Sequence, residues 1–368
     1  MEAILLLTSI ILILLSGLVV MFLASYLRFP VPLMLILLGF LLGYLGIMLP
    51  YEILNAFAIV SISLIMIDLA ARLRWKEFDS SFQMPLKLSV LLFLVSIAVI
   101  GFFCIKLTGM DFELAVVFAS LIPASIIIMS HNNRIEHFLL NESLFAAPIA
   151  ILLPLILGGA FIKQGTPLDF LQEIVVSIGM GIVAGVLLIK IIKKAYHDKL
   201  SYLAVACFSV LSYVMAELLD GNGILAVGIV GLILGNMYVR GKPKIYVFSG
   251  DITKALHILI FVLFGILGFV FFDSDIFTAG VIIFFVFMLV RWFCIQVIIG
   301  KGRFSELEKA IIAFKYPVAL PAAATSLVLF SAVFNFSYQG TSLFVLALSI
   351  VILSEILSWC VKHFLVRE

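Results

Sequence analysis

Apolar runs of about twenty residues recur along the whole chain and constrain its fold more than any other feature. Twenty residues of α-helix rise about 30 Å, which matches the hydrocarbon thickness of a bilayer. Hydrophobic residues make up 64% of the chain and charged residues 12%, against about 45–50% and 25% in soluble domains. The sequence therefore predicts an all-α, polytopic transmembrane helical bundle.

We expect about thirteen membrane-spanning helices, joined by short connectors that carry most of the charge. Their expected ranges are 3–27, 31–49, 53–71, 86–107, 112–130, 142–162, 168–194, 201–219, 221–239, 251–273, 276–300, 305–331 and 340–363. Together they predict a single transmembrane domain over residues 1–363. Glu2, rather than a basic segment, precedes the first run, so we expect a retained helix and not a cleaved signal peptide.

The placement of lysine and arginine predicts the orientation of the bundle. Most of the 23 basic residues fall in connectors that follow odd-numbered spans, whereas the even-numbered connectors hold only Lys106 and Lys163. Cytoplasmic loops carry the excess of basic residues. The sequence therefore predicts an N-terminus outside and a C-terminus in the cytoplasm, and we expect a prokaryotic inner or plasma membrane.

Several function classes are not supported by the composition. The four cysteines lie inside apolar runs and form no CxxC pair, so we expect packing residues and neither a disulfide framework nor a metal site. No loop is long enough for a catalytic domain, and no cofactor motif is present. A net charge of +2 gives no indication of nucleic-acid binding. We expect a protein that is not an enzyme.

Ionisable residues inside membrane spans are functional candidates, because burying them in hydrocarbon costs free energy. Asp68 precedes Arg72 by four residues, and an interfacial ion pair explains it. Arg291, Lys315 and Glu355 lie deep in three consecutive spans, where pairing with one another is the least costly arrangement. They predict either a structural ion-pair network or a solute path, and the sequence leaves both open.

Prolines interrupt two of the expected spans near the middle of the membrane. One reads SLIPAS from Ser120 through Pro123 to Ser125, and the other reads KYPVALP from Lys315 through Pro317. Proline removes a backbone hydrogen bond, so both helices should be bent or broken. Each is the fifth span of its half, with 168–194 as the connecting helix, which indicates inverted repeats with two broken crossing helices. Ordinary helix kinks are the alternative.

Small-residue spacings predict close helix contacts in the second half of the chain. Gly179-x-Gly181-x-x-x-Gly185 and Gly228-x-x-Gly231-x-x-x-Gly235 both fit this pattern. Such residues let helix backbones approach closely in a membrane.

Four stretches together resemble the cation:proton antiporter superfamily, in the branch of thirteen-span sodium/proton exchangers. They are SYVMAELLDGNGILAVGIVGLILGN (212–236), LRFPVPLMLILLGFLLG (27–43), NESLF (141–145), similar to the start of the family's sixth helix, and Arg291. The resemblance implies a homodimeric transporter of monovalent cations and protons. It also implies dimerisation and scaffold helices at 1–75 and 201–273, and a mobile core at 86–163 and 276–363.

The chain departs from this family where active members carry their aspartates. Leu121-Ile122-Pro123 stands in place of threonine-aspartate-proline, and Ala146-Ala147 in place of the asparagine-aspartate or paired aspartates after Glu142. An alanine binds neither a cation nor a proton. The resemblance also implies a structural ion pair between Glu142 and Arg291.

The leading hypothesis is therefore a secondary transporter with a degenerate ion-coupling site. The candidate path residues are Ser120, Pro123, Ser125, Glu142, Arg291, Lys315, Pro317 and Glu355. Glu142 or Glu355 could be the protonatable group, and Lys315 a fixed counter-cation, a proton-releasing amine or an anion ligand. The alternatives are a non-exchanging sensor, effector or scaffold, and a transporter of an anion or neutral solute.

Overall fold

The computed structural model describes residues 2–73, 82–123, 134–163, 166–194, 198–237, 242–300, 304–315, 319–333 and 337–364. These ranges contain fourteen α-helices, one π-helical segment and no strand, so the predicted all-α class is confirmed. The elements are α1 (Glu2–Leu27), α2 (Val31–Tyr44), α3 (Tyr51–Arg72), α4 (Gln83–Thr108), α5 (Phe112–Leu121), α6 (Arg134–Lys163), α7 (Pro167–Lys194), α8 (Asp198–Glu217), α9 (Gly223–Asn236), α10 (Lys242–Val270), α11 (Ser274–Ile299), α12 (Glu306–Phe314), α13 (Ala319–Val328), η2 (Leu329–Val333) and α14 (Tyr338–Phe364).

The apolar runs account for the transmembrane character of the bundle. Within the described residues, seven helices are long and apolar enough to cross a membrane, and six further apolar helices have 10–17 residues. The shorter ones include one part of each interrupted span, α5 and the segment Leu320–Ser331. The count of about thirteen membrane passes stays a prediction.

Several predicted helix boundaries are wrong, and two helices begin earlier than expected. Helix α6 begins at Arg134 rather than 142, and α10 begins at Lys242 rather than 251. The hydropathy pattern marks only the part of a helix that lies in hydrocarbon, whereas backbone hydrogen bonds continue into polar turns at the interface. Glu142 therefore lies well inside α6, and the NESLF stretch does not start it. Helix α2 is shorter than expected and ends at Tyr44 instead of 49.

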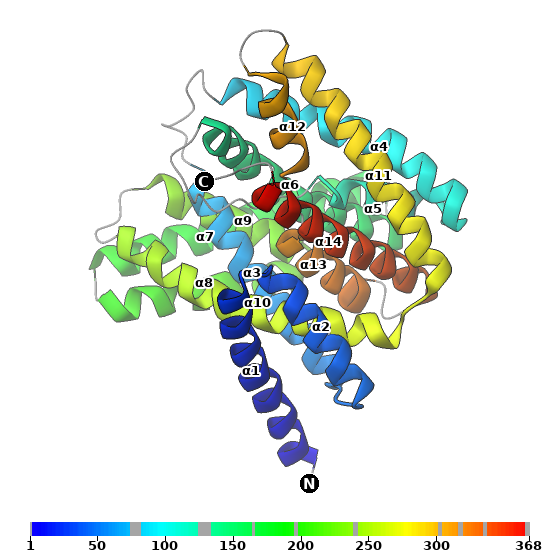
Figure 1. Cartoon of the computed structure of the whole chain (residues 1–368). Coiled ribbons are helices and arrows are strands. Elements are labelled where there is room, and N and C mark those ends of the chain that lie inside the picture. Colours follow the sequence, from blue (N-terminus) through cyan, green and yellow to red (C-terminus); the bar gives the residue numbers. More distant parts are fainter. Residues whose placement is uncertain are drawn as a thin grey trace.

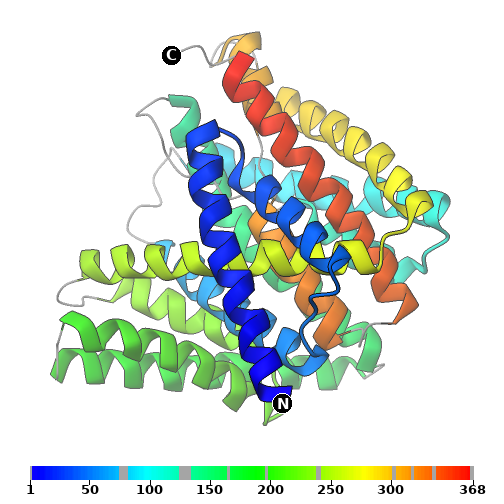
Figure 2. The same ribbon diagram turned by 60° about the horizontal axis from the view of Figure 1, so that its bottom comes forward.

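The helices form two neighbouring groups. Helix α10 packs on α2, α9 on α3 and α7, and α8 on α7 and α9, while α4, α5, α6, α11 and α14 pack among themselves. In both views α7 and α8 lie on the opposite side of the bundle from α4 and α11 (Figures 1 and 2). Helix α13 contacts α3 and α10 as well as α6 and α14, so it joins the two groups.

Glycines make the closest helix contacts in the first group. A Cβ atom on Gly235 of α9 would lie 2.5 Å from the Ala71 carbonyl oxygen of α3. A Cβ atom on Gly181 of α7 would lie 2.6 Å from the Ala226 carbonyl oxygen of α9. These contacts confirm the predicted packing role of both spacings. The expectation is wrong for Gly179, because nothing lies within 4 Å of a Cβ atom there.

We expect Gly235→Ala to destabilise the protein by about 1–3 kcal/mol, the range for overpacking against groups that cannot move aside. The free energy of unfolding in detergent measures the effect. Gly179→Ala is the matched control, and it should be neutral or stabilising by up to about 1 kcal/mol through helix propensity. Equal effects at the two glycines would contradict the close contact of α3 with α9.

Candidate ion and solute site

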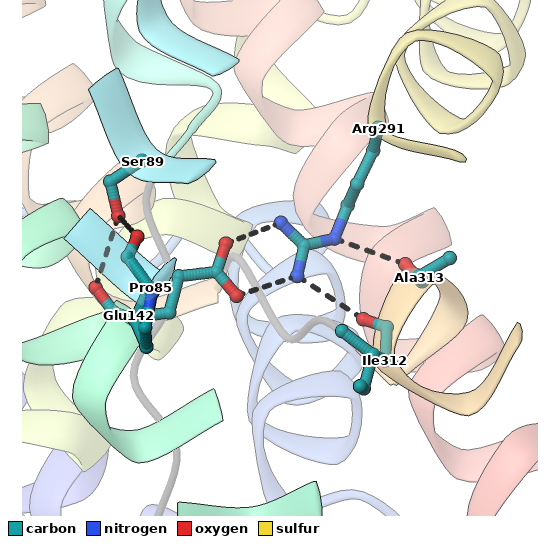
Figure 3. Close-up of polar contacts among 6 residues, drawn as sticks. All are labelled: Pro85, Ser89, Glu142, Arg291, Ile312 and Ala313. Carbon is teal, nitrogen blue, oxygen red and sulfur yellow. Dashed lines mark hydrogen bonds and ion pairs between the residues drawn. The ribbon is translucent and has the colours of Figure 1, made fainter. Parts of the chain in front are cut away.

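A buried ion pair joins α6 to α11 at the centre of the second helix group. Arg291 donates from its two terminal nitrogens to Glu142 Oε1 at 2.6 Å and Oε2 at 2.9 Å (Figure 3). Both side chains are fully buried. A two-pronged guanidinium–carboxylate contact fixes geometry as well as charge. The structure thus forms the pair that the family resemblance implies.

The same guanidinium donates hydrogen bonds to the C-terminal end of α12. Arg291 Nε donates to the Ala313 carbonyl at 3.1 Å, and its terminal nitrogen donates to the Ile312 carbonyl, also at 3.1 Å. The last carbonyls of a helix have no partner within the helix, and hydrocarbon supplies none. Helix α12 ends at Phe314, and α13 starts at Ala319, so the predicted interruption of this span is confirmed. Arg291 holds one side of that interruption.

Helix α4 is the fourth helix that contacts this site. Ser89 Oγ donates to the Pro85 carbonyl at 3.0 Å and to the Glu142 carbonyl at 3.5 Å (Figure 3). Ser89 is buried, and its hydroxyl donates to backbone oxygens rather than to the Glu142 carboxylate. Glu142 is therefore fixed by both its main chain and its side chain.

A second ion pair reaches the same helix break and was missed by sequence analysis. Lys315 Nζ lies 3.1 Å from Glu136 Oε1, and the two side chains are 16% and 7% exposed. Lys315 caps the C-terminal end of α12, where its N–H group bonds the Ile311 carbonyl. Glu136 was assigned to a connector because the predicted span began at 142. Its position six residues before Glu142, in a stretch free of glycine and proline, was the available signal.

The deep charges do not pair with one another as the sequence suggested. Arg291 pairs with Glu142 and Lys315 with Glu136, so Glu355 belongs to neither network. The predicted i,i+4 pair is confirmed, with Arg72 donating to Asp68 at 2.7 Å. Both cations have their partners on α6, and Glu136 lies in the first turns of this helix, which the expected boundaries had assigned to a connector.

The positions at the helix crossing that the family resemblance aligns with motif aspartates are apolar. Ile122, Ala146 and Ala147, which the resemblance places at the family's motif positions, are buried with at most 1% exposure. Ser120 is also buried, and its hydroxyl donates to the Val117 carbonyl of its own helix at 2.7 Å. Helix α5 ends at Leu121, just before the buried Pro123, as the predicted break requires.

Two candidate residues, Ser125 and Pro317, lie outside the described residues. Within the described ranges no group of three or more His, Cys, Asp or Glu side chains is arranged to hold a metal ion.

A neutral polar contact between the two helix groups was also missed. Ser331 Oγ, in η2, donates to Asn55 Oδ1 of α3 at 3.2 Å. Thr325 of α13 is fully buried, and its hydroxyl has no partner among the described residues. The sequence analysis did not single out Asn55, Thr325 or Ser331, because serine, threonine and asparagine occur at many positions of the chain.

Comparison with known proteins identifies the scaffold. The family model for the transmembrane sodium/hydrogen exchanger matches residues 10–365. The chain belongs to the sodium/hydrogen exchanger family. It is accordingly an integral membrane protein and a cation:proton antiporter-like transporter, in a family of transporters rather than enzymes.

Solved structures share this fold. The sodium proton antiporter MjNhaP1 from Methanocaldococcus jannaschii at pH 8 superimposes with a TM-score of 0.81 at 20% identity, covering 99% of this chain and 98% of that chain. A structure of the same antiporter from an electron-microscopy map gives 0.76 at 17% identity, covering 99% and 97%. At these identities the likeness shows the exchanger fold alone.

We expect Glu142→Gln to destabilise this exchanger-family protein by about 3–5 kcal/mol, because it leaves a buried guanidinium without a counter-charge. Chemical denaturation in detergent measures the change. Glu113→Gln, at an exposed carboxylate, is the control and should change stability by less than about 0.5 kcal/mol.

The double variant Glu142→Leu/Arg291→Met should recover only part of that loss. It removes both buried charges but leaves the Ile312 and Ala313 carbonyls without their donor. Full recovery would contradict the role of Arg291 in partnering the end of α12.

Each single change at the second pair, Glu136→Lys or Lys315→Glu, should cost at least the roughly 1.5–3 kcal/mol of a charged hydrogen bond. The exchanged pair Glu136→Lys/Lys315→Glu should regain most of it, as a double-mutant cycle detects. Additive losses would show that the two side chains act independently.

Proposed function

We propose that this chain is a secondary transporter that exchanges protons for a monovalent cation by alternating access, without the family's usual cation-binding carboxylates. The family match supports the transporter class and these substrates. The absence of a cation-binding carboxylate is supported by Glu142. Its side chain is fully buried, and Arg291 binds both of its oxygens. A carboxylate held in this way braces the broken helix and is not available to a cation.

In this proposal, two groups of helices move relative to each other during transport. Helices α1–α3 and α8–α10 would form the scaffold and the homodimer contact, and α4–α6 and α11–α14 the core. The extensive packing within each group and the smaller contacts between them support a rigid-body displacement of one against the other. We propose the same orientation as the basic residues predict, with the C-terminus in the cytoplasm of a prokaryotic cell.

A second function is favoured by the apolar crossing. Ile122, Ala146 and Ala147 are buried among other side chains, and a crossing with no free carboxylate is what a non-exchanging sensor, effector or scaffold would retain. Flux measurements separate these possibilities from exchange.

We expect proteoliposomes with an acidic interior to show proton efflux when sodium, potassium or lithium is added outside, and protonophore should abolish the signal. A trapped pH-sensitive dye reports the flux. The same vesicles with choline are the control, because choline is too large for a site built for a small cation. No flux with any of the three cations would favour the non-exchanging scaffold.

The variants Ala147→Asp and Ala147→Asn test whether a carboxylate at the helix crossing is enough to increase sodium-dependent transport. We expect the aspartate to raise sodium-dependent flux and the uncharged asparagine, of equal size, to leave it unchanged. Equal behaviour of the two variants would show that the charge at this position no longer controls transport.

A further inference from the structure

Glu355 is a deep carboxylate that the ion-pair networks leave unused. It lies in the second half of α14 and is 8% exposed. No described residue gives it a hydrogen bond or an ion pair. An isolated carboxylate in such a place is costly to keep charged, and a residue of this kind inside a membrane span marks a functional site by default.

Glu355 lies on the face of α14 that packs against the scaffold helices. Leu348, seven residues before it, would lie 2.9 Å from a Cβ atom on Gly268 of α10. Trp359, four residues after it, donates from its indole nitrogen to the Arg28 carbonyl at 3.0 Å and packs against Phe29, with ring centroids 5.6 Å apart. Residues spaced by four and seven share one face of a helix. That face runs from α10 to the corner between α1 and α2.

The core helix α11 contacts a different face of α14. A Cβ atom on Gly280 of α11 would meet the Ser349 hydroxyl and would lie 3.4 Å from Leu346. These two residues precede Glu355 by six and nine positions and so lie off its stripe. Glu355 thus belongs to the contact between the two helix groups rather than to the Arg291 site.

The elements packed around α14 offer Glu355 little charge. Helix α2 carries no ionisable residue before Tyr44 at its far end, and α13 and η2 carry none. On α10, His257 is the titratable group among the described side chains. Arg28, whose carbonyl accepts from Trp359 at this corner, is an exposed basic residue.

Among the described side chains, the remaining charges near α14 lie at its ends or are already paired. Asp111, before α5, accepts from Gln339 at the opposite end of α14, and Glu113 of α5 is exposed. On α11, Asp275 is exposed near the start of the helix and Arg291 binds Glu142. On α12, Glu306 pairs with Lys309, Lys315 pairs with Glu136, and Glu308 completes the helix cap. The His363 ring contacts the Trp359 ring in a tilted arrangement, with ring centroids 5.0 Å apart.

We propose that Glu355 is a proton-binding site on the contact between α14 and the α1–α2 corner, and that its proton controls how the core helices sit on the scaffold. With the proton bound, the neutral carboxyl is compatible with the apolar face of α2. When the proton leaves to water, the carboxylate favours a position nearer to solvent and to Arg28, which displaces α14. By linkage, the displacement in turn weakens proton binding. Coupling of this proton to transport rests on the proposed function, but binding of the proton and the displacement do not.

Trp359 reports this displacement directly, because it lies one helical turn from Glu355. Replacing Trp75 and Trp292 by phenylalanine leaves Trp359 as the single tryptophan of the three in the chain. His363→Gln removes the titratable ring that contacts it. We expect the emission of Trp359 in detergent to change in one transition as the pH is raised from acidic to mildly alkaline.

In this background Glu355→Gln should hold Trp359 in its low-pH state at every pH, since glutamine copies the shape of the protonated carboxyl. Glu355→Asp should keep a transition, and Glu113→Gln is the matched control that should leave it unchanged. A transition that persists in Glu355→Gln would overturn the proposal, as would a Trp359 emission that does not change with pH in the background protein.

The transport consequence is a separate measurement. In proteoliposomes Glu355→Gln should reduce pH-gradient-driven flux on the order of tenfold or more while its unfolding transition in detergent is retained. Unchanged flux in a stable Glu355→Gln variant would overturn the coupling role. If the unaltered protein carries no flux, the proposed function fails, and the Trp359 titration still decides whether Glu355 binds the proton.

Discussion

Hydrocarbon cannot donate hydrogen bonds to the carbonyls at a helix end. The structure of the core depends on how the protein supplies donors where the α12–α13 span is interrupted. The carbonyls of Ile312 and Ala313 at the end of α12 accept from Arg291. A guanidinium carries its own burial cost, so it requires a buried anion, and Glu142 supplies it. Breaking a helix in the membrane thus requires three elements, α6, α11 and α12, to be held in one geometry.

This arrangement separates structural charge from transport charge. Once Glu142 is committed to Arg291, and the crossing positions hold Ile122 and Ala147, the described core has no free carboxylate where the family's aspartates would stand. Glu355 lies elsewhere, on the contact between the two helix groups. We propose that this chain keeps the rigid frame of its family while its proton-binding carboxylate, Glu355, lies at the contact between the two helix groups.

The sequence predicted the helices and their interruptions better than it predicted which charged side chains pair. Apolar runs predicted the helical membrane class, prolines predicted the two interruptions, and the four-residue spacing predicted the pair of Asp68 with Arg72. The pair of Glu136 with Lys315 was missed because hydropathy ended the expected helix too early. The expected mutual pairing of Arg291, Lys315 and Glu355 was wrong, because closeness in span order is not closeness in space.

The sequence by itself determined what depends on neighbours along the chain. Twenty-residue apolar runs must span hydrocarbon as helices, and proline must interrupt the hydrogen bonds of its own helix. The tertiary structure decided which distant charges meet: the pair of Glu142 with Arg291, 149 residues apart, was implied only by the family resemblance, and the pair of Glu136 with Lys315, 179 residues apart, was missed. It also decided that Glu355 faces the scaffold, since the face that a buried helix turns toward each neighbour is set by packing and not by its own nearly uniform hydrophobicity.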